Sequence, residues 1–190
     1  MEKSSSLAIL ILAAGSSSRL GEPKQLVKYQ EHSLLYHSSI NALKLKNDVH
    51  VVLGSNYEEC KDQIENLNVN IIKNENYKDG LSSSIKAGIS KLQNYEKVLI
   101  MLCDQPFIDE NHFLNLIQRS QEIPKIVCSF YKNDVAVPAI FSKEYYPQLL
   151  NLAGDKGAKK IIKTNPYEKV LLDNKFAVDI DIQDDKKYLS

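Results

Sequence analysis

The sequence predicts an α/β fold in which a mostly parallel central sheet is covered by helices on both faces. Two apolar runs, over residues 7–14 (LAILILAA) and 97–103 (KVLIMLC), support this fold. Continuous apolar runs of this length are typical of strands that are buried on both faces. Short apolar runs also alternate with amphipathic stretches along the chain, which favours parallel strands joined by helices. We therefore expect one domain, residues 1–190, built as a three-layer α/β/α sandwich.

The predicted elements follow in a regular order. Ser33 is placed to cap a helix that runs to about Leu45, because a serine side chain can accept a hydrogen bond from a free amide of the first turn. Further strands are predicted at residues 49–53, 69–73, 125–129, 136–141, 170–172 and 177–180. Further helices are predicted at residues 57–67, 82–92, 110–120, 143–152 and 156–164.

Composition and charge exclude several classes of protein. Lys plus Arg (24) balances Asp plus Glu (24), which argues against a general nucleic-acid binder, because such proteins carry excess positive charge. No stretch approaches the ~20 apolar residues that span a bilayer, and the early apolar run fits a secretory signal poorly. The three cysteines, Cys60, Cys103 and Cys128, show neither disulfide nor zinc-ligand spacing. We expect a cytoplasmic protein without a nucleic-acid or membrane partner.

The segment after the first apolar run predicts a phosphate-binding loop. Ligands of open parallel sheets bind at the carboxyl ends of strands, where residues 15–24 (GSSSRLGEPK) begin. Gly15 allows close backbone approach, and consecutive amides can form a nest for phosphate oxygens. Arg19 and Lys24 add two cations. The glycine spacing excludes both a Walker A loop and a GxGxxG fingerprint, so the local alternative is a serine-rich surface turn.

A carboxylate follows the second apolar run. Asp104 lies two residues before Pro106, which would stiffen the turn and leave the side chain at the edge of the sheet. Mg²⁺ prefers one or two such carboxylates together with substrate phosphates. The alternative is an Asx turn or a helix cap. Asp179 and Asp181 follow a short predicted strand, where alternation would place both on one face, so either could complement Asp104.

Two turns of small residues precede predicted helices. Residues 80–84 (GLSSS) open a helix whose first amides could receive polar ligand groups, although a simple serine cap explains them equally well. Residues 154–158 (GDKGA) form the second turn. The histidines, which show neither metal nor triad spacing, are His32, His37, His50 and His112.

Taken together, these segments resemble the molybdenum cofactor cytidylyltransferase family, within the Rossmann-like nucleotidyltransferases. The pattern LAAGxSxRLGxxK at residues 12–24 is specific to that group. The segments GLSSS, CDQP, GDKGA and DID then follow in the order and spacing of the family. The resemblance covers nearly the whole chain.

The resemblance implies a Mg²⁺-dependent transfer of CMP from CTP to the terminal phosphate of a pterin, with Arg19, Lys24 and Asp104 in catalytic roles. It implies that Asp104 and Asp181 bind Mg²⁺, with Asp179 as the alternative second ligand. The implied nucleotide-binding residues are Leu12, Ala13, Ala14, Gly15, Ser16, Ser17, Ser18, Arg19, Lys24, Gly80, Ser82 and Asp104. The implied acceptor-binding residues are Gly154, Asp155, Lys156 and Gly157.

The resemblance also bears on donor, acceptor and partner. Members with alanine at the position of Ala14 tend to use CTP, whereas guanylyltransferase relatives usually carry a second glycine there. The family usually has GxP where this chain has Ala136-Val137-Pro138, which weakens the acceptor assignment. A molybdenum hydroxylase is the implied recipient of the product. The alternatives are GTP as donor, a sugar or isoprenoid phosphate as acceptor, a non-catalytic pterin carrier for a molybdoenzyme, and, more distantly, a dinucleotide-binding oxidoreductase.

Overall fold

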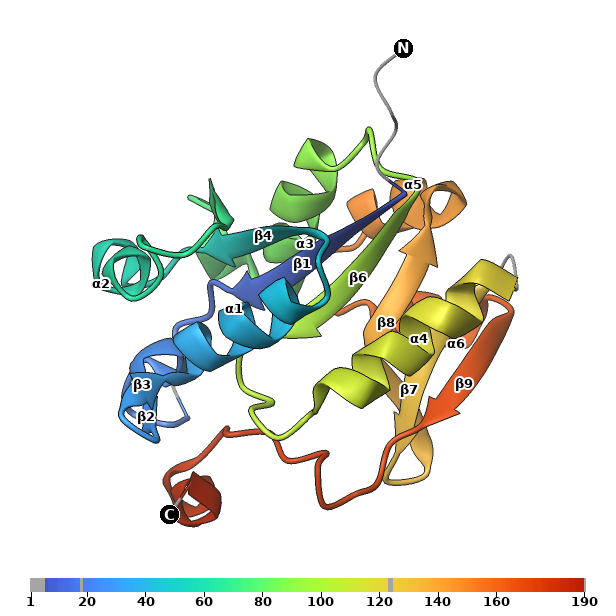
Figure 1. Ribbon diagram of the computed structural model, residues 1–190. Coiled ribbons are helices and arrows are strands. Elements are labelled where there is room, and N and C mark those ends of the chain that lie inside the picture. The colour runs from blue at the N-terminus through green and yellow to red at the C-terminus, as the bar shows by residue number, and fades with distance from the viewer. Residues whose placement is uncertain (1–5, 18, 123–124, 190) are drawn as a thin grey trace.

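The computed structural model describes residues 6–17, 19–122 and 125–189 (Figure 1). Seven strands form the central sheet: β1 (Leu7–Ala13), β4 (Asp48–Leu53), β5 (Asn70–Lys73), β6 (Lys97–Leu102), β7 (Ile126–Tyr131), β8 (Asp134–Ser142) and β9 (Tyr167–Leu171). Their order is β5-β4-β1-β6-β8-β7-β9. Within the described sheet β8 alone runs against its neighbours, pairing antiparallel with β6 and β7. The predicted mostly parallel sheet is confirmed.

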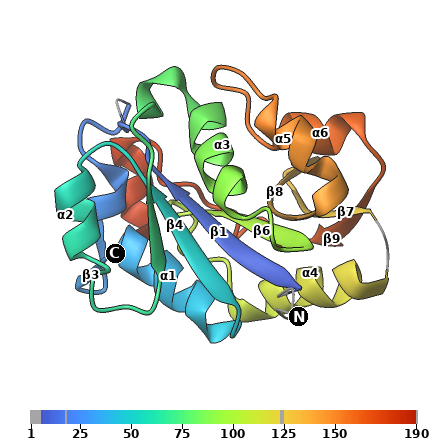
Figure 2. The same ribbon diagram turned by 90° about the horizontal axis from the view of Figure 1, so that it is seen from above.

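Helices cover both faces of this sheet. They are α1 (Leu34–Lys44), α2 (Tyr57–Asp62), α3 (Leu81–Lys91), α4 (Glu110–Glu122), α5 (Tyr146–Leu150) and α6 (Lys159–Thr164). Figure 2 shows α3, α5 and α6 on one side of the sheet and α1 and α4 on the other, which confirms the three-layer sandwich. Ser33 caps α1 as predicted, because its Oγ accepts a hydrogen bond from the Tyr36 amide at 3.1 Å. None of the helices in the described part of the chain is long and apolar enough to cross a membrane.

The central strand β1 is held from both sides. All seven of its residues are buried, and alternate side chains enter different cores. Ile9 and Ile11 pack in the core that includes α1, α2 and α4, whereas Leu10 packs in the core that includes α3, α5 and α6. At Gly88 of α3, an added Cβ would lie 2.5 Å from the Leu10 side chain. The helix therefore lies directly against β1, which gives the loop after β1 a rigid support.

Several predicted elements differ from the structure. α2 ends at Asp62 rather than Leu67, because the following residues form turns with bonds three residues apart, such as Ile64 N–H to Lys61 O. The helix predicted at 143–152 is divided into a 3₁₀ turn and α5, and α6 begins at Lys159. A small hairpin, β2 (Lys28–Tyr29) with β3 (His32–Ser33), was not predicted.

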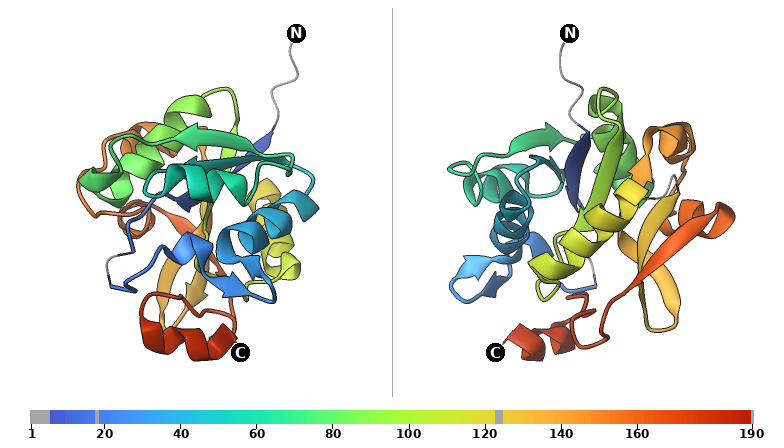
Figure 3. Two further views of the ribbon diagram at one scale, coloured as in Figure 1. Left: turned by 90° about the vertical axis from the view of Figure 1, so that its left-hand side faces the viewer. Right: turned by 45° about the vertical axis from the view of Figure 1, so that its right-hand side comes forward.

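The strand predicted at residues 177–180 is wrong. The segment crosses the end of β6, where the Ile180 amide donates to the Asp104 carbonyl at 3.0 Å. The chain then forms a 3₁₀ helix, Gln183–Leu189, which Figure 3 shows in red at the bottom of both views, on the side of the molecule opposite the N-terminus. The Gln183 side chain donates to the Leu20 carbonyl, and Ile180 packs in a small core with Leu20. These contacts fix the C-terminal segment against the loop after β1.

Candidate active site

The buried side chain of Gln25 forms hydrogen bonds to the start of the loop after β1. This side chain is 1% exposed, and its Nε2 donates to the carbonyl oxygens of Ala13 (2.9 Å) and Gly15 (2.7 Å). Ser17 adopts a positive φ of 55° and its Oγ accepts from the Lys24 amide at 3.0 Å. The described residues on either side of Ser18 are therefore held by specific hydrogen bonds at the carboxyl end of a buried strand, where ligands of such sheets bind.

Lys24 lies between two carboxylates that come from distant parts of the chain. Its Nζ is 2.5 Å from Asp104 Oδ2, at the end of β6, and 2.7 Å from Asp181 Oδ1, in the C-terminal segment. Arg19 reaches the other oxygen of Asp181 at 3.3 Å, although the Arg19 side chain is 73% exposed. The four residues form one charged cluster, in which Asp104 is buried and Lys24 is half-buried.

The charges in this cluster stabilise one another. Burial alone would lower the pKa of Lys24, but the charge of Asp104 and the hydrogen bonds to both carboxylates raise it above its ordinary value. Burial would raise the pKa of Asp181, but the hydrogen bond and charge of Lys24 lower it below its ordinary value. Lys24 is therefore a cation and Asp181 an anion near neutral pH.

The two carboxylates have the chemistry of a divalent-cation site. The second oxygen of Asp104, Oδ1, is buried and has no hydrogen-bond partner among the described residues. Such an oxygen is costly to bury unless it meets a donor or a cation. The described residues contain no group of three or more His, Cys, Asp or Glu able to hold a metal ion. Mg²⁺ held by Asp104 and Asp181 would therefore take its remaining ligands from phosphate and water oxygens.

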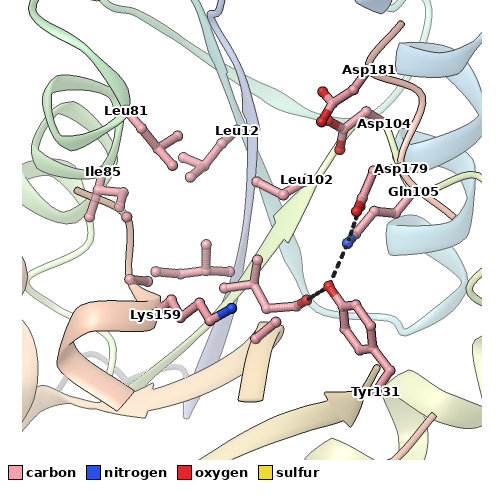
Figure 4. A pocket seen from close by; sticks show the side chains of 15 residues that line it. Leu12, Leu81, Ile85, Leu102, Asp104, Gln105, Tyr131, Lys159, Asp179 and Asp181 are labelled. Atoms are coloured by element: carbon pink, nitrogen blue, oxygen red, sulfur yellow. Dashed lines mark hydrogen bonds between the residues drawn. The ribbon is translucent and has the colours of Figure 1, made fainter. Parts of the chain in front are cut away.

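A second polar cluster begins at Gln105, the residue after Asp104. Gln105 Nε2 donates to Asp179 Oδ1 at 2.8 Å and to the Tyr131 hydroxyl at 3.2 Å, and that hydroxyl donates to the Val137 carbonyl at 3.3 Å (Figure 4). Burial, and then the charge of Asp104, raise the pKa of Asp179 above its ordinary value. The expectation that Asp179 and Asp181 would be equivalent on one strand face fails, because their segment is not a strand and the two side chains have different partners.

Two cavities meet at these clusters. The larger, about 460 Å³, lies over the loop after β1 and the start of α3. The smaller, about 260 Å³, lies between β6, β8, α3 and α6 and has mostly apolar walls (Figure 4). The residues that line both cavities are Leu12, Leu81, Leu102, Asp104 and Asp181. A group bound in one cavity therefore meets a group bound in the other beside the carboxylates of Asp104 and Asp181.

Most of the predicted nucleotide-binding residues gather around the larger cavity. Those that line it are Leu12, Ala13, Ala14, Gly15, Ser16, Arg19, Lys24, Gly80 and Asp104. Ser17 supports the loop instead, and Ser18 lies outside the described residues. Ser82 is buried and lines neither cavity, whereas Ser84, two residues further along α3, lines the larger one.

The predicted acceptor turn is divided between the cavities. Gly157 lines the smaller cavity, Asp155 lines the larger one, and Lys156 borders a separate hollow on the surface. Gly154 lines neither cavity, but its carbonyl accepts from the Ser82 amide at 3.2 Å. At Gly80, with φ +91°, a Cβ would lie 2.5 Å from Asp155, so this turn packs closely on the start of α3.

Several residues at the site were not singled out in the sequence. Gln25, Gln105 and Tyr131 complete its hydrogen bonds, and Tyr77, Lys78 and Lys159 line its cavities. The glutamines directly follow Lys24 and Asp104, so a polar residue adjacent to each predicted functional residue was the available signal. Tyr131 and Lys159 had no such signal, because only tertiary packing brings them to the site.

Comparisons with known proteins show the family of this chain. Residues 9–170 match the model of the MobA-like NTP transferase domain. The molybdenum cofactor cytidylyltransferase of Escherichia coli strain K12 is 25% identical over 183 residues, covering 95% of this chain and 94% of that protein. The bifunctional protein GlmU of Aliarcobacter butzleri is 38% identical over 110 residues, which cover 55% of this chain but only 24% of GlmU.

The fold is shared with a solved structure. Rv0371c from Mycobacterium tuberculosis H37Rv superposes with a TM-score of 0.88 at 24% identity, covering 97% of each chain. The family match therefore covers most of the chain, from within β1 to within β9. The chain belongs to the MobA-like NTP transferase domain family and is a nucleotidyltransferase.

Proposed function

We propose that this nucleotidyltransferase transfers CMP from CTP to the terminal phosphate of molybdopterin or the molybdenum cofactor and releases pyrophosphate. The observation that carries the proposal is the meeting of two cavities at Asp104 and Asp181, since the transfer needs a donor and an acceptor on either side of one phosphorus atom. The choice of substrates is supported by the Escherichia coli relative, a molybdenum cofactor cytidylyltransferase whose match covers 95% of this chain.

In this proposal the larger cavity binds CTP. The backbone amides of Gly15 and Ser16 and the cations Arg19 and Lys24 bind the triphosphate. Tyr77 and Ser84 also line this cavity, and in this proposal they contact the nucleoside. The donor assignment to CTP rests on Ala14, because the guanylyltransferase relatives usually carry glycine at this position.

The smaller cavity binds the acceptor, with its phosphate directed toward the shared carboxylates. An acceptor phosphate oxygen attacks the α-phosphorus of CTP in line, the bond from that phosphorus to the β-phosphate oxygen breaks, and pyrophosphate leaves with the bonding electrons. A phosphate monoester is already ionised near neutral pH, so the attack needs no strong general base. Arg19 and Lys24 lie where they can stabilise the negative charge of the departing pyrophosphate.

Asp104 and Asp181 are the proposed ligands of Mg²⁺. When bound, the ion supplies positive charge next to the phosphates that react. Asp104 fits this role through its unpartnered Oδ1, and Asp181 through its contact with the same Lys24 ammonium. In the absence of substrate, Lys24 balances the two carboxylates. It can turn to the triphosphate when another cation takes this role. The product is delivered to a molybdenum hydroxylase in the cytoplasm.

The test is a donor and acceptor panel with the purified protein. Calorimetry with CTP and GTP, with and without MgCl₂, gives the donor preference, and mass spectrometry identifies the product formed from phosphorylated pterin, sugar phosphate or isoprenoid phosphate. We expect Mg²⁺-dependent CTP binding, CMP transfer to the pterin, and a loss of about 100-fold or more in turnover for Asp104→Asn with the fold retained. A preference for GTP would overturn the donor. Pterin binding without pyrophosphate release would favour a carrier.

A further inference from the structure

We infer that Asp179 recognises the acceptor and does not bind the metal ion, and that it accepts hydrogen bonds from ring N–H groups of the acceptor. This inference rests on the proposed function, because it takes the smaller cavity as the acceptor site. It adds a specificity-determining residue and defines the chemistry that the acceptor must present.

The position of Asp179 separates it from the proposed metal ligands. Asp104 and Asp181 line both cavities and both contact the Lys24 ammonium, whereas Asp179 lines only the smaller of the two cavities. Its carboxylate is bound by Gln105 Nε2 at 2.8 Å, and the described residues form no ion pair with it. Asp179 therefore offers a negative charge to a ligand of the smaller cavity, away from the triphosphate loop.

Gln105 provides an independent indication of a ligand. This residue is 7% exposed and lines the smaller cavity, and its Oε1 is buried without a hydrogen-bond partner among the described residues. Tyr131 and Asp179 both accept hydrogen bonds from Nε2. These bonds orient the Gln105 amide, and its Oε1 remains without a partner among the described residues. Buried acceptors of this kind are normally paired, so an N–H or O–H donor of a ligand is the expected partner.

The walls of the cavity narrow the class of acceptor. Leu12, Ile85 and Val137 form apolar surfaces, and the Lys159 amine lies across the cavity from the polar cluster (Figure 4). A ring with apolar faces and N–H groups on its edge matches both features, as the ring of a reduced pterin does. An isoprenoid chain has no N–H or O–H donor, so an isoprenoid phosphate would leave Gln105 Oε1 without a hydrogen-bond partner.

The experiment compares Asp179→Asn with Asp181→Asn and with Asp173→Asn, an exposed control that pairs with Lys175. Binding of Mn²⁺ in the presence of CTP is measured by calorimetry, and the acceptor KM and kcat are measured at saturating CTP. We expect Asp179→Asn to bind Mn²⁺ and CTP as the wild type does and to raise the acceptor KM about tenfold or more, because a charge-assisted hydrogen bond is lost. Asp181→Asn should lose Mn²⁺ affinity, and Asp173→Asn should match the wild type.

Two results would overturn the inference. One is a loss of Mn²⁺ affinity in Asp179→Asn comparable to that in Asp181→Asn, which would make Asp179 a metal ligand. The other is an unchanged acceptor KM. Failure of the proposed function is distinct, because the wild type itself would then not transfer CMP to the phosphorylated pterin. In that case a wild type that transfers only to acceptors without ring N–H groups would overturn the acceptor chemistry, and the Mn²⁺ comparison would still test the metal assignment.

Discussion

Replacing Lys24 with methionine tests whether its ammonium holds the two carboxylates together. Methionine keeps much of the apolar stem but removes the charge that lies 2.5 Å from Asp104 and 2.7 Å from Asp181. Without a divalent cation, the variant should be less stable than the wild type. With MnCl₂ added, the loss should be largely recovered, because a cation between the carboxylates replaces the missing charge.

The magnitude follows from the burial of each partner. Removing one member of a buried ion pair typically costs about 3–5 kcal/mol, because the other charge is left uncompensated. The Asp104 side chain is 11% exposed, so this range applies to it. Asp181 is 33% exposed and keeps Arg19, so solvent screens its loss and it adds little. We expect a destabilisation of about 3 kcal/mol, which corresponds to about 10 °C in Tm for a chain of this size.

The assay is thermal and urea unfolding of the wild type, Lys24→Met and Lys78→Met, each with and without MnCl₂. Lys78 lines the same cavity but is exposed, so its variant controls for a general loss of positive charge. Mn²⁺ should stabilise Lys24→Met by more than it stabilises the wild type. Equal stability of wild type and Lys24→Met without metal, or an equal gain from Mn²⁺ in both, would refute the reasoning.

Two further predictions concern buried residues that pack helices against the sheet. Gly88→Ala should cost about 1–3 kcal/mol in the free energy of unfolding measured in urea, because the added Cβ would lie 2.5 Å from the Leu10 side chain; an unchanged midpoint would show that α3 can shift freely on β1. His112 is buried with its Nε2 2.8 Å from Ser129 Oγ, and burial, partly offset by the charge of Asp109, lowers its pKa to about 4. The unfolded chain therefore binds the proton first as the pH falls below 6.5. Between pH 7.5 and 5 the wild type should lose about 2 kcal/mol more than His112→Asn, and parallel losses would contradict this assignment.

The sequence was sufficient for the parts of the fold and site that depend on local signals. The apolar runs at residues 7–14 and 97–103 became the adjacent parallel strands β1 and β6, so the loop after one and Asp104 after the other lie at the same edge of the sheet. The contact between Lys24 and Asp104 follows from this pairing. The serine cap of α1 was also available locally, because its hydrogen bond spans three residues.

The parts that failed depend on distant contacts. Residues 177–180 have the composition of a strand but do not pair with the sheet as one. A hydrogen bond from the Ile180 amide to the Asp104 carbonyl connects them to the residues after β6. Ser82 lies at the start of a helix, where ligand binding was expected, but the turn at residues 154–157 packs against this helix start. Neither outcome can be read from local periodicity, because each is decided by a segment far along the chain.

The irregular backbone of residues 177–181 explains how one short segment contributes a carboxylate to each polar cluster. Had residues 177–181 formed a strand, Asp179 and Asp181 would have shared a face and competed for the position beside Asp104. The irregular backbone instead directs Asp181 to Lys24 at 2.7 Å and Asp179 to Gln105 at 2.8 Å. Because Gln105 follows Asp104 directly, a shift of this turn would move both carboxylate clusters together. Acceptor recognition and charge balance at the proposed metal site are thus coupled through two adjacent residues, so variants of Gln105 should affect both, whereas variants of Asp179 should affect the acceptor alone.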